Sequence, residues 1–325
     1  MTARGTYDGH GRHRAGRWLA GLLLLGVTAV GACRAADTDA LTPVTQALAF
    51  LPWLLVPTVT ALLLALLARW WTGLVWAVAV MGLLAWYIEP YGRTRLPDGP
   101  PLASLRILTA NVEFGQAAGA LAAAVGDQDA DLVFVQECDQ PCDALLRREL
   151  GASHPHRVAE PAAGSHGSVL LGKFPLTPAE GVDGTMAMPG AVADVRGQPV
   201  RLQLAHPMPP LPGGTGPWRR ELGALRDLAA GHGRTPLVLA GDFNASQDHA
   251  AFRRVLDTGL QDAARLGGHD RTPTWPARTT PAFGAQIDHV LLSRDFSVRT
   301  IRFLDLPGTD HRAVLAHVTL HRPQG

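Results

Sequence analysis

Residues 237–245 read LVLAGDFNA, an apolar run that leads directly into Gly-Asp-Phe-Asn. The run has the composition of a short strand buried on both faces of a sheet, and Gly241 marks its end. Asp242 and Asn244 therefore stand at a strand terminus, where a rigid sheet can hold catalytic side chains in fixed positions. A single Asp or Asn after a strand is more often a turn or a helix cap, so this segment alone does not indicate a site.

The same arrangement recurs along residues 104–325, where apolar runs are bordered by oxygen-bearing side chains or imidazoles. These residues are Asn111 after 105–110, Glu137 after 132–135, His206 after 202–205, Asp288 and His289 after Ile287, and Asp310 and His311 before 313–318. With Asp242 they make six such positions of one chemical kind, which caps and turns do not explain. We therefore expect these side chains to cluster in one site.

Strand-like runs alternate with a few helical segments in this part of the chain. Strands are predicted at 105–112, 131–136, 168–171, 192–195, 200–204, 236–240, 287–292, 298–303 and 313–320. Helices are predicted at 116–128, which is rich in alanine, and at 218–230, where leucines follow helical spacing. Many strands with few helices predict an α/β fold of two packed sheets flanked by helices.

The front of the chain has a different composition. Only four residues between Trp18 and Ile88 are charged, and six of the eight tryptophans lie before residue 90. Apolar runs at 18–33, 47–68 and 70–88 predict about three transmembrane helices. A buried core helix is the alternative, and the spanning length of the second and third runs argues against it. Pro52 and Pro57 in the second run are tolerated in a membrane helix that packs on its neighbours.

The first apolar run has a second interpretation. Basic residues precede a 15-residue apolar segment, which is also the layout of a signal peptide. Val-Gly-Ala-Cys at 30–33 resembles a lipoprotein cleavage box. We favour an uncleaved span, and the predicted topology of the remaining chain is the same in either case.

The distribution of arginine predicts the orientation. Arg4, Arg12, Arg14 and Arg17 make residues 1–17 a basic cytoplasmic N-terminus. Three crossings then place the rest of a multi-pass plasma-membrane protein outside the cell. Residues 90–103 are predicted to be a Pro/Gly-rich linker, and residues 104–325 form the extracytoplasmic domain.

Charge and cysteine content exclude several classes of protein. The chain of 325 residues has a net charge of +1, with 18% charged and 47% apolar residues, so it is not a charged disordered tail. Residues 104–325 have no Lys/Arg-rich run with interleaved aromatics, so no stable nucleic-acid partner is expected. Three cysteines rule out a zinc site of four cysteines or a multi-bridge scaffold. The sequence does not indicate an oligomeric state.

As a set, the motifs of residues 104–325 resemble the endonuclease/exonuclease/phosphatase superfamily, which includes deoxyribonuclease I, exonuclease III and neutral sphingomyelinases. The matching segments are TANV 109–112, VQE 135–137, GSVLLGKFP 167–175, AHP 205–207, GDFNA 241–245, TWP 274–276, QIDHVLLS 286–293 and TDHRAV 309–314. The resemblance implies a four-layer α/β/β/α sandwich of the deoxyribonuclease I type. With its three predicted spans, the chain is further similar to VanJ-type glycopeptide-resistance membrane proteins.

The resemblance also implies a role for each residue of the predicted site. Glu137, with Asn111 and Asp310, would hold Mg²⁺ or Mn²⁺, because these hard ions prefer carboxylate and carbonyl oxygens. Asp242 would position and deprotonate the attacking water. Asn244 would donate a hydrogen bond to the phosphate as charge builds in the transition state.

The imidazoles and two further residues complete the implied site. His311, oriented by Asp288, would contact the phosphate or transfer a proton, and His206 would be a second imidazole on the phosphate. Trp275 is either part of the pocket wall or core. His166 is either a site residue or part of a surface loop. Cys138 and Cys142 would pair if the domain lies outside the cell, and otherwise they are two free thiols.

Three functions are compared for this domain. A membrane-anchored phosphoesterase would act on a lipid-linked or envelope phosphate, with membrane lipids and a phosphoester as its partners. An extracytoplasmic nuclease of the deoxyribonuclease type is the alternative. A non-catalytic sensor is disfavoured because every motif residue is present. The anchor and the lack of a basic track favour the first function, although fold alone does not identify a substrate.

Overall fold

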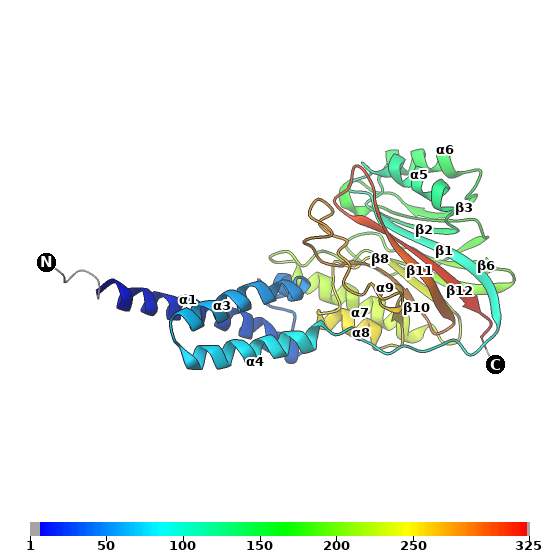
Figure 1. Ribbon diagram of the computed structural model, residues 1–325. Coiled ribbons are helices and arrows are strands. Elements are labelled where there is room, and N and C mark those ends of the chain that lie inside the picture. The colour runs from blue at the N-terminus through cyan, green and yellow to red at the C-terminus, as the bar shows by residue number, and fades with distance from the viewer. Residues whose placement is uncertain (1–6, 324–325) are drawn as a thin grey trace. The chain divides into compact units, whose positions relative to one another are not determined.

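The computed structural model describes residues 7–323, without the side chains of residues 7–10 and 12. Arg4 and the side chain of Arg12, both part of the predicted basic N-terminus, lie outside this description. The chain divides into two compact units (Figure 1). One comprises the residues up to Pro90 together with Asp248–Ala250, and the other comprises Tyr91–Gln247 together with the residues from Ala251 onward.

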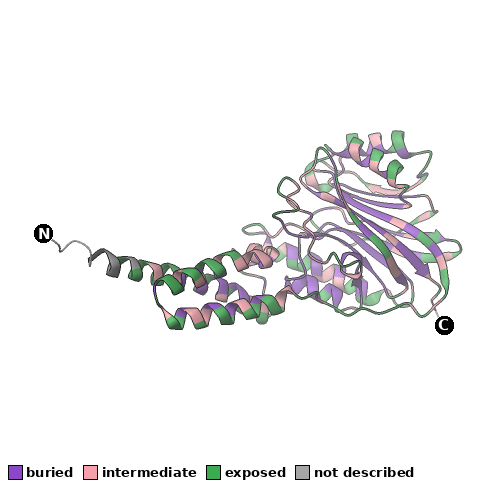
Figure 2. Ribbon diagram, in the orientation of Figure 1, coloured by how far each residue is buried: buried purple, intermediate pink, exposed green. Residues whose placement is uncertain are grey.

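The first unit is helical. Its elements are α1 (Tyr7–Ala35), α2 (Val44–Ala49), the 3₁₀ helix η1 (Leu51–Leu54), α3 (Leu55–Leu67) and α4 (Trp71–Ile88). Small and medium-sized apolar side chains fill its core, including Leu24, Ala61 and Ala77. Much of the surface of these helices is exposed (Figure 2), and the larger side chains of Trp71 and Trp86 are about three-quarters exposed.

Two stretches of this unit are long and apolar enough to cross a membrane, His13–Ala35 and Trp71–Ile88. The expectation of three such helices is therefore not confirmed. The predicted span 47–68 is not one helix, because the chain leaves helical geometry at Phe50 and Pro52 begins a new turn in η1. Proline lacks an amide hydrogen and is accepted in the first turn of a helix but not in its interior. The apolar helix that follows, Leu51–Leu67, is shorter than a typical span.

The second unit contains two six-stranded sheets, and the expected α/β fold of two packed sheets flanked by helices is confirmed. The first sheet has the order β11-β12-β1-β2-β4-β3 and the second has the order β5-β6-β7-β8-β10-β9. The strands are β1 (Pro101–Asn111), β2 (Leu132–Gln136), β3 (His156–Glu160), β4 (Ser168–Gly172), β5 (Leu176–Ala179), β6 (Gly190–Val195), β7 (Gln198–Ala205), β8 (Leu237–Asp242), β9 (Gln261–Asp262), β10 (Asp288–Leu292), β11 (Phe296–Asp305) and β12 (Arg312–His321).

Three buried clusters hold the layers together. Residues such as Leu105, Phe134 and Val238 fill the space between the two sheets. Helices α5 (Ala118–Gln128) and α6 (Gln140–Leu150) cover the outer face of the first sheet. Helices α7 (Thr215–Gly231) and α8 (Ala250–Leu256) cover the second sheet, with Trp218 and Phe252 fully buried beneath them. The short elements η2 (Gly164–His166) and α9 (Ala263–Leu266) complete the unit.

Each sheet has one parallel pair at its centre, and a helix connects the two strands of that pair. Strands β1 and β2 are joined through α5, and β7 and β8 are joined through α7. The carboxyl ends of such a pair lie at the same edge of the sheet, so Asn111 is opposite Gln136, and Ala205 is opposite Gly241. Gly241 is required there, because a Cβ atom would lie 1.9 Å from the carbonyl oxygen of Ala205.

The segment predicted to be a linker is bonded to the second unit over much of its length. The amide of Tyr91 donates to Gln247, and the amide and carbonyl of Arg95 both bond to the side chain of Gln261. Arg265 donates to the carbonyl of Gly92. Strand β1 begins at Pro101, three residues before the predicted start of the domain. Glu89 and Pro90 are thus the only residues between the end of α4 and the first of these bonds.

Candidate active site

The predicted residues of the first sheet meet at the ends of β1 and β2. The amide nitrogen of Asn111 donates to Glu137 Oε1 at 3.0 Å and to Asp242 Oδ2 at 3.1 Å, so one side chain bridges two carboxylates. The oxygen of Asn111 accepts the amide hydrogen of Glu113. The second carboxylate oxygen of Glu137 accepts from the amide of Phe114 at 3.1 Å. Asn111 therefore connects the two sheets at the site.

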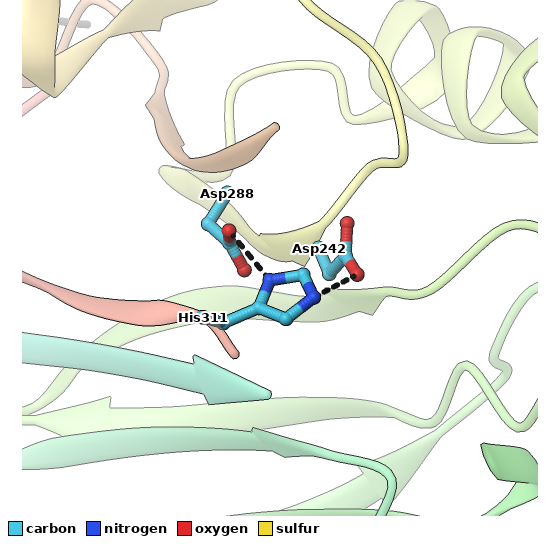
Figure 3. A group of neighbouring side chains, drawn as sticks. All are labelled: Asp242, Asp288 and His311. Atoms are coloured by element: carbon cyan, nitrogen blue, oxygen red, sulfur yellow. Dashed lines mark hydrogen bonds and ion pairs between the residues drawn. The ribbon is translucent and has the colours of Figure 1, made fainter. Parts of the chain in front are cut away.

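Asp242, Asp288 and His311 form the buried group drawn in Figure 3. His311 Nδ1 lies 3.0 Å from Asp288 Oδ2, and its Nε2 lies 3.8 Å from Asp242 Oδ2. Asp242 ends β8, Asp288 begins the adjacent antiparallel strand β10, and the two residues are paired across the sheet. His311 comes from the first sheet, directly before β12. The imidazole therefore lies between two acids, and the contact with Asp288 is the one that the resemblance implies.

Burial and neighbouring charge shift the pKa values of this group. Burial raises the pKa of Asp242 to about 7, and the negative charge of Asp288 contributes to the rise. Burial also opposes the charged form of His311, but Asp288 and Asp242 outweigh it and raise the pKa of His311 to about 10. Near pH 8, Asp242 is thus mostly ionised while His311 keeps its proton, which gives the site one base and one acid.

His206 is the uncharged imidazole of the site. Burial, and then the positive charge of His311, lower the pKa of His206 to about 3. Its Nε2 lies 3.9 Å from Glu137 Oε1, and within the described residues its buried Nδ1 has no hydrogen-bond partner. A neutral imidazole with an unused nitrogen is suited to a hydrogen bond with a substrate oxygen.

Asn244 and Asp310 lie at the periphery of the group. The backbone amide of Asn244 donates to Asp242 Oδ1 at 2.8 Å, while its side chain donates to the carbonyl of Pro207. Asp310 Oδ1 lies 3.8 Å from His311 Nε2, and Asp310 Oδ2 accepts from the indole of Trp275. The exposed His166 hydrogen-bonds locally with the carbonyl of Ala163. The structure thus brings Asp310 and His311 together, and Trp275 supports Asp310.

Two threonines hold residues of the candidate site in place. Thr309 Oγ donates to the carbonyl of Asn111 and accepts the amide hydrogen of His311, so it links β1 to the backbone of His311. Thr274 Oγ accepts the amide hydrogens of Ile287 and Asp288. Both threonines lie inside motifs that the sequence analysis identified. The role of each threonine is visible only in its side-chain hydrogen bonds, because such bonds leave no periodic pattern in the sequence.

The donor set fits a divalent cation. Glu137, Asp310, Asp242 and Asp288 supply carboxylate oxygens, the ligands that Mg²⁺ and Mn²⁺ prefer. The buried Asp288 Oδ1 has no hydrogen-bond partner among the described residues. The described protein groups therefore leave at least one carboxylate oxygen of the site without a hydrogen bond, and a cation could bind it. One ligand atom each from Asp242, Asp288 and His311 lies within 4.8 Å of the others. This set differs from the predicted ligands Glu137, Asn111 and Asp310, which border it.

Cys138 and Cys142 form a disulfide directly after Glu137. Both cysteines are buried, and Asp139 between them caps α6 by accepting the amide hydrogen of Cys142. Glu137 itself has φ of 59°, a left-handed conformation that is unfavourable for a residue with a Cβ. The sequence left open a disulfide or two free thiols, and the structure contains the disulfide. It constrains the backbone next to the Glu137 carboxylate.

Comparisons with known proteins agree with this geometry. The sequence model described as the endonuclease/exonuclease/phosphatase family matches residues 108–311. An endonuclease/exonuclease/phosphatase from Beutenbergia cavernae is 20% identical, with a TM-score of 0.57 over 68% of this chain and 73% of that one. A family protein from Bacteroides thetaiotaomicron is 17% identical, with a TM-score of 0.55 over 68% and 99%.

A third solved structure is the 3′ phosphatase NExo from Neisseria, bound to a product DNA hairpin. It is 19% identical, with a TM-score of 0.54 over 65% of this chain and 98% of that one. At these identities the likeness establishes the fold. No curated protein sequence matches the chain.

Proposed function

Because this chain belongs to the endonuclease/exonuclease/phosphatase family, we propose that it is a membrane-anchored, divalent-metal-dependent phosphoesterase with an extracytoplasmic site. Its proposed substrate is a lipid-linked or envelope phosphate. The observation that carries the catalytic part is the buried Asp242–His311–Asp288 group, which lies within one hydrogen bond of Asn111 and, through it, of Glu137. This arrangement supplies a base, an acid and a metal-binding carboxylate at one edge of the sandwich.

The proposed reaction is hydrolysis of a phosphoester by water. Asp242 takes a proton from the attacking water, and its raised pKa makes it a stronger base than an ordinary carboxylate. His311, charged and oriented by Asp288, donates a hydrogen bond or a proton to the phosphate or the leaving oxygen. Neutral His206 and the side-chain amide of Asn244, which has a second hydrogen besides the one donated to Pro207, would donate to the other phosphoryl oxygens.

The metal ion has a defined place in this proposal. Glu137 would hold it, with Asn111 and Asp310 nearby, as Mg²⁺ or Mn²⁺. When bound, the ion neutralises charge on a phosphoryl oxygen. Asn111 holds the carboxylates of Glu137 and Asp242 close together, so the metal ligand and the base are positioned by the same side chain.

The apolar helices and the disulfide support an anchored, outward-facing domain. His13–Ala35 and Trp71–Ile88 have the length and composition of membrane spans, and large apolar side chains are exposed along these helices. Arg14 and Arg17 at the start of the first helix favour a cytoplasmic N-terminus. A disulfide between Cys138 and Cys142 is stable in an oxidising compartment, such as the outside of a bacterial cell.

The proposed lipid substrate follows from the short connection to the anchor. Two residues separate Ile88, the last residue of α4, from Tyr91, which is bonded to the catalytic unit. A domain joined to a membrane anchor by so short a tether would meet lipid head groups at an effective concentration of about a millimolar or more, as is typical of short linkers. The tether gives no such advantage for a soluble polynucleotide.

The test is a side-by-side assay of the purified full-length protein. In nonionic micelles, we expect metal-dependent phosphate release from a polyprenyl diphosphate, and little cleavage of plasmid DNA. Rapid cleavage of DNA with no release from lipid would favour the nuclease instead. For the orientation, alkaline phosphatase fused after Gly325 is expected to be active and a cytoplasmic fluorescent reporter at the same position dark. The reverse result would contradict an extracytoplasmic site.

A further inference from the structure

Large apolar side chains are exposed on the loops that lead away from the catalytic residues. In the described part of the second unit, the large apolar side chains exposed to solvent are those of Leu96, Phe114, Leu211 and Phe283. Three of the four follow or precede a site residue closely. Phe114 lies three residues after Asn111, Leu211 five after His206, and Phe283 five before Asp288. Three of the four exposed side chains are thus close in sequence to a residue of the proposed site.

The Phe114 loop is held rigidly against the metal-binding carboxylate. The amide of Phe114 donates to Glu137 Oε2, and the amide of Glu113 donates to Asn111. Glu113 and Phe114 both have positive φ, at 43° and 56°. This conformation is costly for an aromatic residue, and Phe114 is 51% exposed. The two hydrogen bonds hold the backbone of this loop at the site.

The other two loops are held at the site as well. Leu211 lies in the segment 207–212, which reads PMPPLP, and the side chain of Asn244 donates to the carbonyl of Pro207. Four prolines restrict this loop, so Leu211 stays exposed without much freedom to fold inward. The loop of Phe283 is tied to Asp310 through the amide of Ala277, and Thr279 bonds to both backbone groups of Phe283.

We propose that Phe114, Leu211 and Phe283 form an apolar rim that enters a lipid surface and delivers a membrane-embedded phosphoester into the catalytic site. This inference rests on the proposed function and narrows its substrate to phosphates that carry a long apolar chain. The rim would be covered by lipid during turnover, which removes the cost of exposing three large apolar side chains to water. The apolar spans of the same chain keep a bilayer available to the rim.

Base stacking is the rival explanation for two of these residues, because aromatic rings stack on nucleobases. It does not account for Leu211, which has no ring. A substitution of Phe283 by leucine separates the two explanations. Leucine keeps the apolar contact with lipid and removes the aromatic face that a base would use.

The first experiment measures insertion without reference to any substrate. Full-length protein with Cys33→Ser receives a polarity-sensitive fluorophore at Leu211→Cys, at Phe283→Cys or, as control, at the exposed Glu149→Cys on α6. The protein is reconstituted in phosphatidylcholine vesicles with a minority of phosphatidylglycerol. We expect nitroxide on the lipid chains to quench the first two labels and aqueous iodide to quench the third. Iodide quenching of all three labels would overturn the proposal.

The second experiment measures delivery of the substrate. It compares undecaprenyl diphosphate in nonionic micelles with dimethylallyl diphosphate, which has the same head group and a short, soluble chain. Leu211→Ser and Phe283→Ser should each lower the ratio of long-chain to short-chain turnover about three- to tenfold. Phe283→Leu and the control Leu96→Ser, which removes an exposed apolar side chain away from the site, should leave the ratio unchanged.

The outcomes separate the rim from the proposed function. An unchanged ratio in both serine variants would refute delivery by the rim and leave the phosphoesterase intact. Labels that enter lipid, with no Asp242-dependent turnover of either diphosphate, would refute the proposed function and its lipid substrate. Loss of DNA cleavage in Phe283→Leu, with no effect on lipid, would establish base stacking instead.

Discussion

The two sheets of the second unit have corresponding orders of strands but end in different side chains. A central parallel pair, a connecting helix and antiparallel neighbours occur at corresponding places in each sheet. Glu137, one residue after Gln136 of β2, therefore corresponds to Asp242, one residue after Gly241 of β8, and Asn111 corresponds to Ala205, the residue before His206. In the proposed mechanism Glu137 of the first sheet holds the metal ion and Asp242 of the second sheet is the base, while His311, directly before β12 of the first sheet, lies against Asp242 and Asp288.

Burial explains the difference between the two carboxylates. The Glu137 side chain is 15% exposed, whereas Asp242 is 2% exposed and Asp288 is fully buried. A carboxylate that reaches solvent can accept an ion from solution, while a buried one beside a second acid acquires a raised pKa. In the proposed mechanism one topology thus yields a metal ligand in one sheet and a base in the other, according to how deeply the end of the strand is buried.

The largest effect is expected from removing the base of the second sheet. Asp242→Asn keeps the size of the side chain and its bond to the amide of Asn244, but it cannot take a proton from water. We expect a loss of turnover of roughly a thousandfold with an unchanged melting temperature. Asp227→Asn, an exposed acid on α7, is the matched control. Substantial turnover in Asp242→Asn would contradict the assignment of the base.

The corresponding change in the first sheet is expected to be rescued by metal. Glu137→Gln should weaken the apparent affinity for Mn²⁺ or Mg²⁺ about 10- to 100-fold. High metal concentration should then restore much of the turnover, whereas it should restore none in Asp242→Asn. A metal titration of both variants measures this difference. If added metal restores the turnover of both variants equally, or of neither, then Glu137 does not act as the metal ligand and Asp242 as the base.

The pH profile tests the coupling between His311, which precedes β12 of the first sheet, and the two acids Asp242 and Asp288 of the second sheet. Wild-type turnover should rise as Asp242 ionises near pH 7 and fall as His311 loses its proton near pH 10. In Asp288→Asn, a negative charge that raises both pKa values is gone, so both limbs should move to lower pH. The exposed Asp305→Asn serves as control. An alkaline limb that stays in place would show that Asp288 does not set the proton affinity of His311.

The smallest effect concerns the disulfide beside the metal ligand. Cys138→Ser with Cys142→Ser should raise the metal concentration for half-maximal turnover several-fold, because the backbone at Glu137 is less constrained. Turnover at saturating metal should change little, and Cys33→Ser should have no effect. A fall in maximal turnover with an unchanged metal requirement would mean that the bridge supports the fold as a whole and not the ligand.

The sequence predicted the parts of the fold that have strong local signals. Apolar runs such as 132–136 and 237–240 gave the central strands, because strands buried on both faces have few alternatives. The same runs located Asn111, Glu137 and Asp242, which the structure brings together. Edge strands β3 and β5 were missed, because their partly exposed residues lack a continuous apolar run.

Other features depend on contacts that no local pattern contains. Helix α6 was not predicted although Asp139 and Pro141 form a recognisable start, because the charged residues 147–149 separate Leu146 from Leu150 and leave only a short apolar face. The second apolar run was predicted as one span, but Phe50 and Pro52 divide it. The bonds of Thr274 and Thr309 join segments distant in the sequence, so only the folded chain reveals them.

The pairing of β1 with β12 has a consequence for how the protein is made. Strand β12 is the last strand to be synthesised, yet it lies beside β1 in the first sheet, with Thr109 opposite Val314. The segment that brings it also carries Asp310 and His311. A nascent chain that still lacks residues 310–321 therefore has neither the strand that pairs with β1 nor the imidazole that lies against Asp242 and Asp288. The candidate site is complete only after β12 has joined the first sheet, so any hydrolysis by this site has to wait until that segment is synthesised and folded.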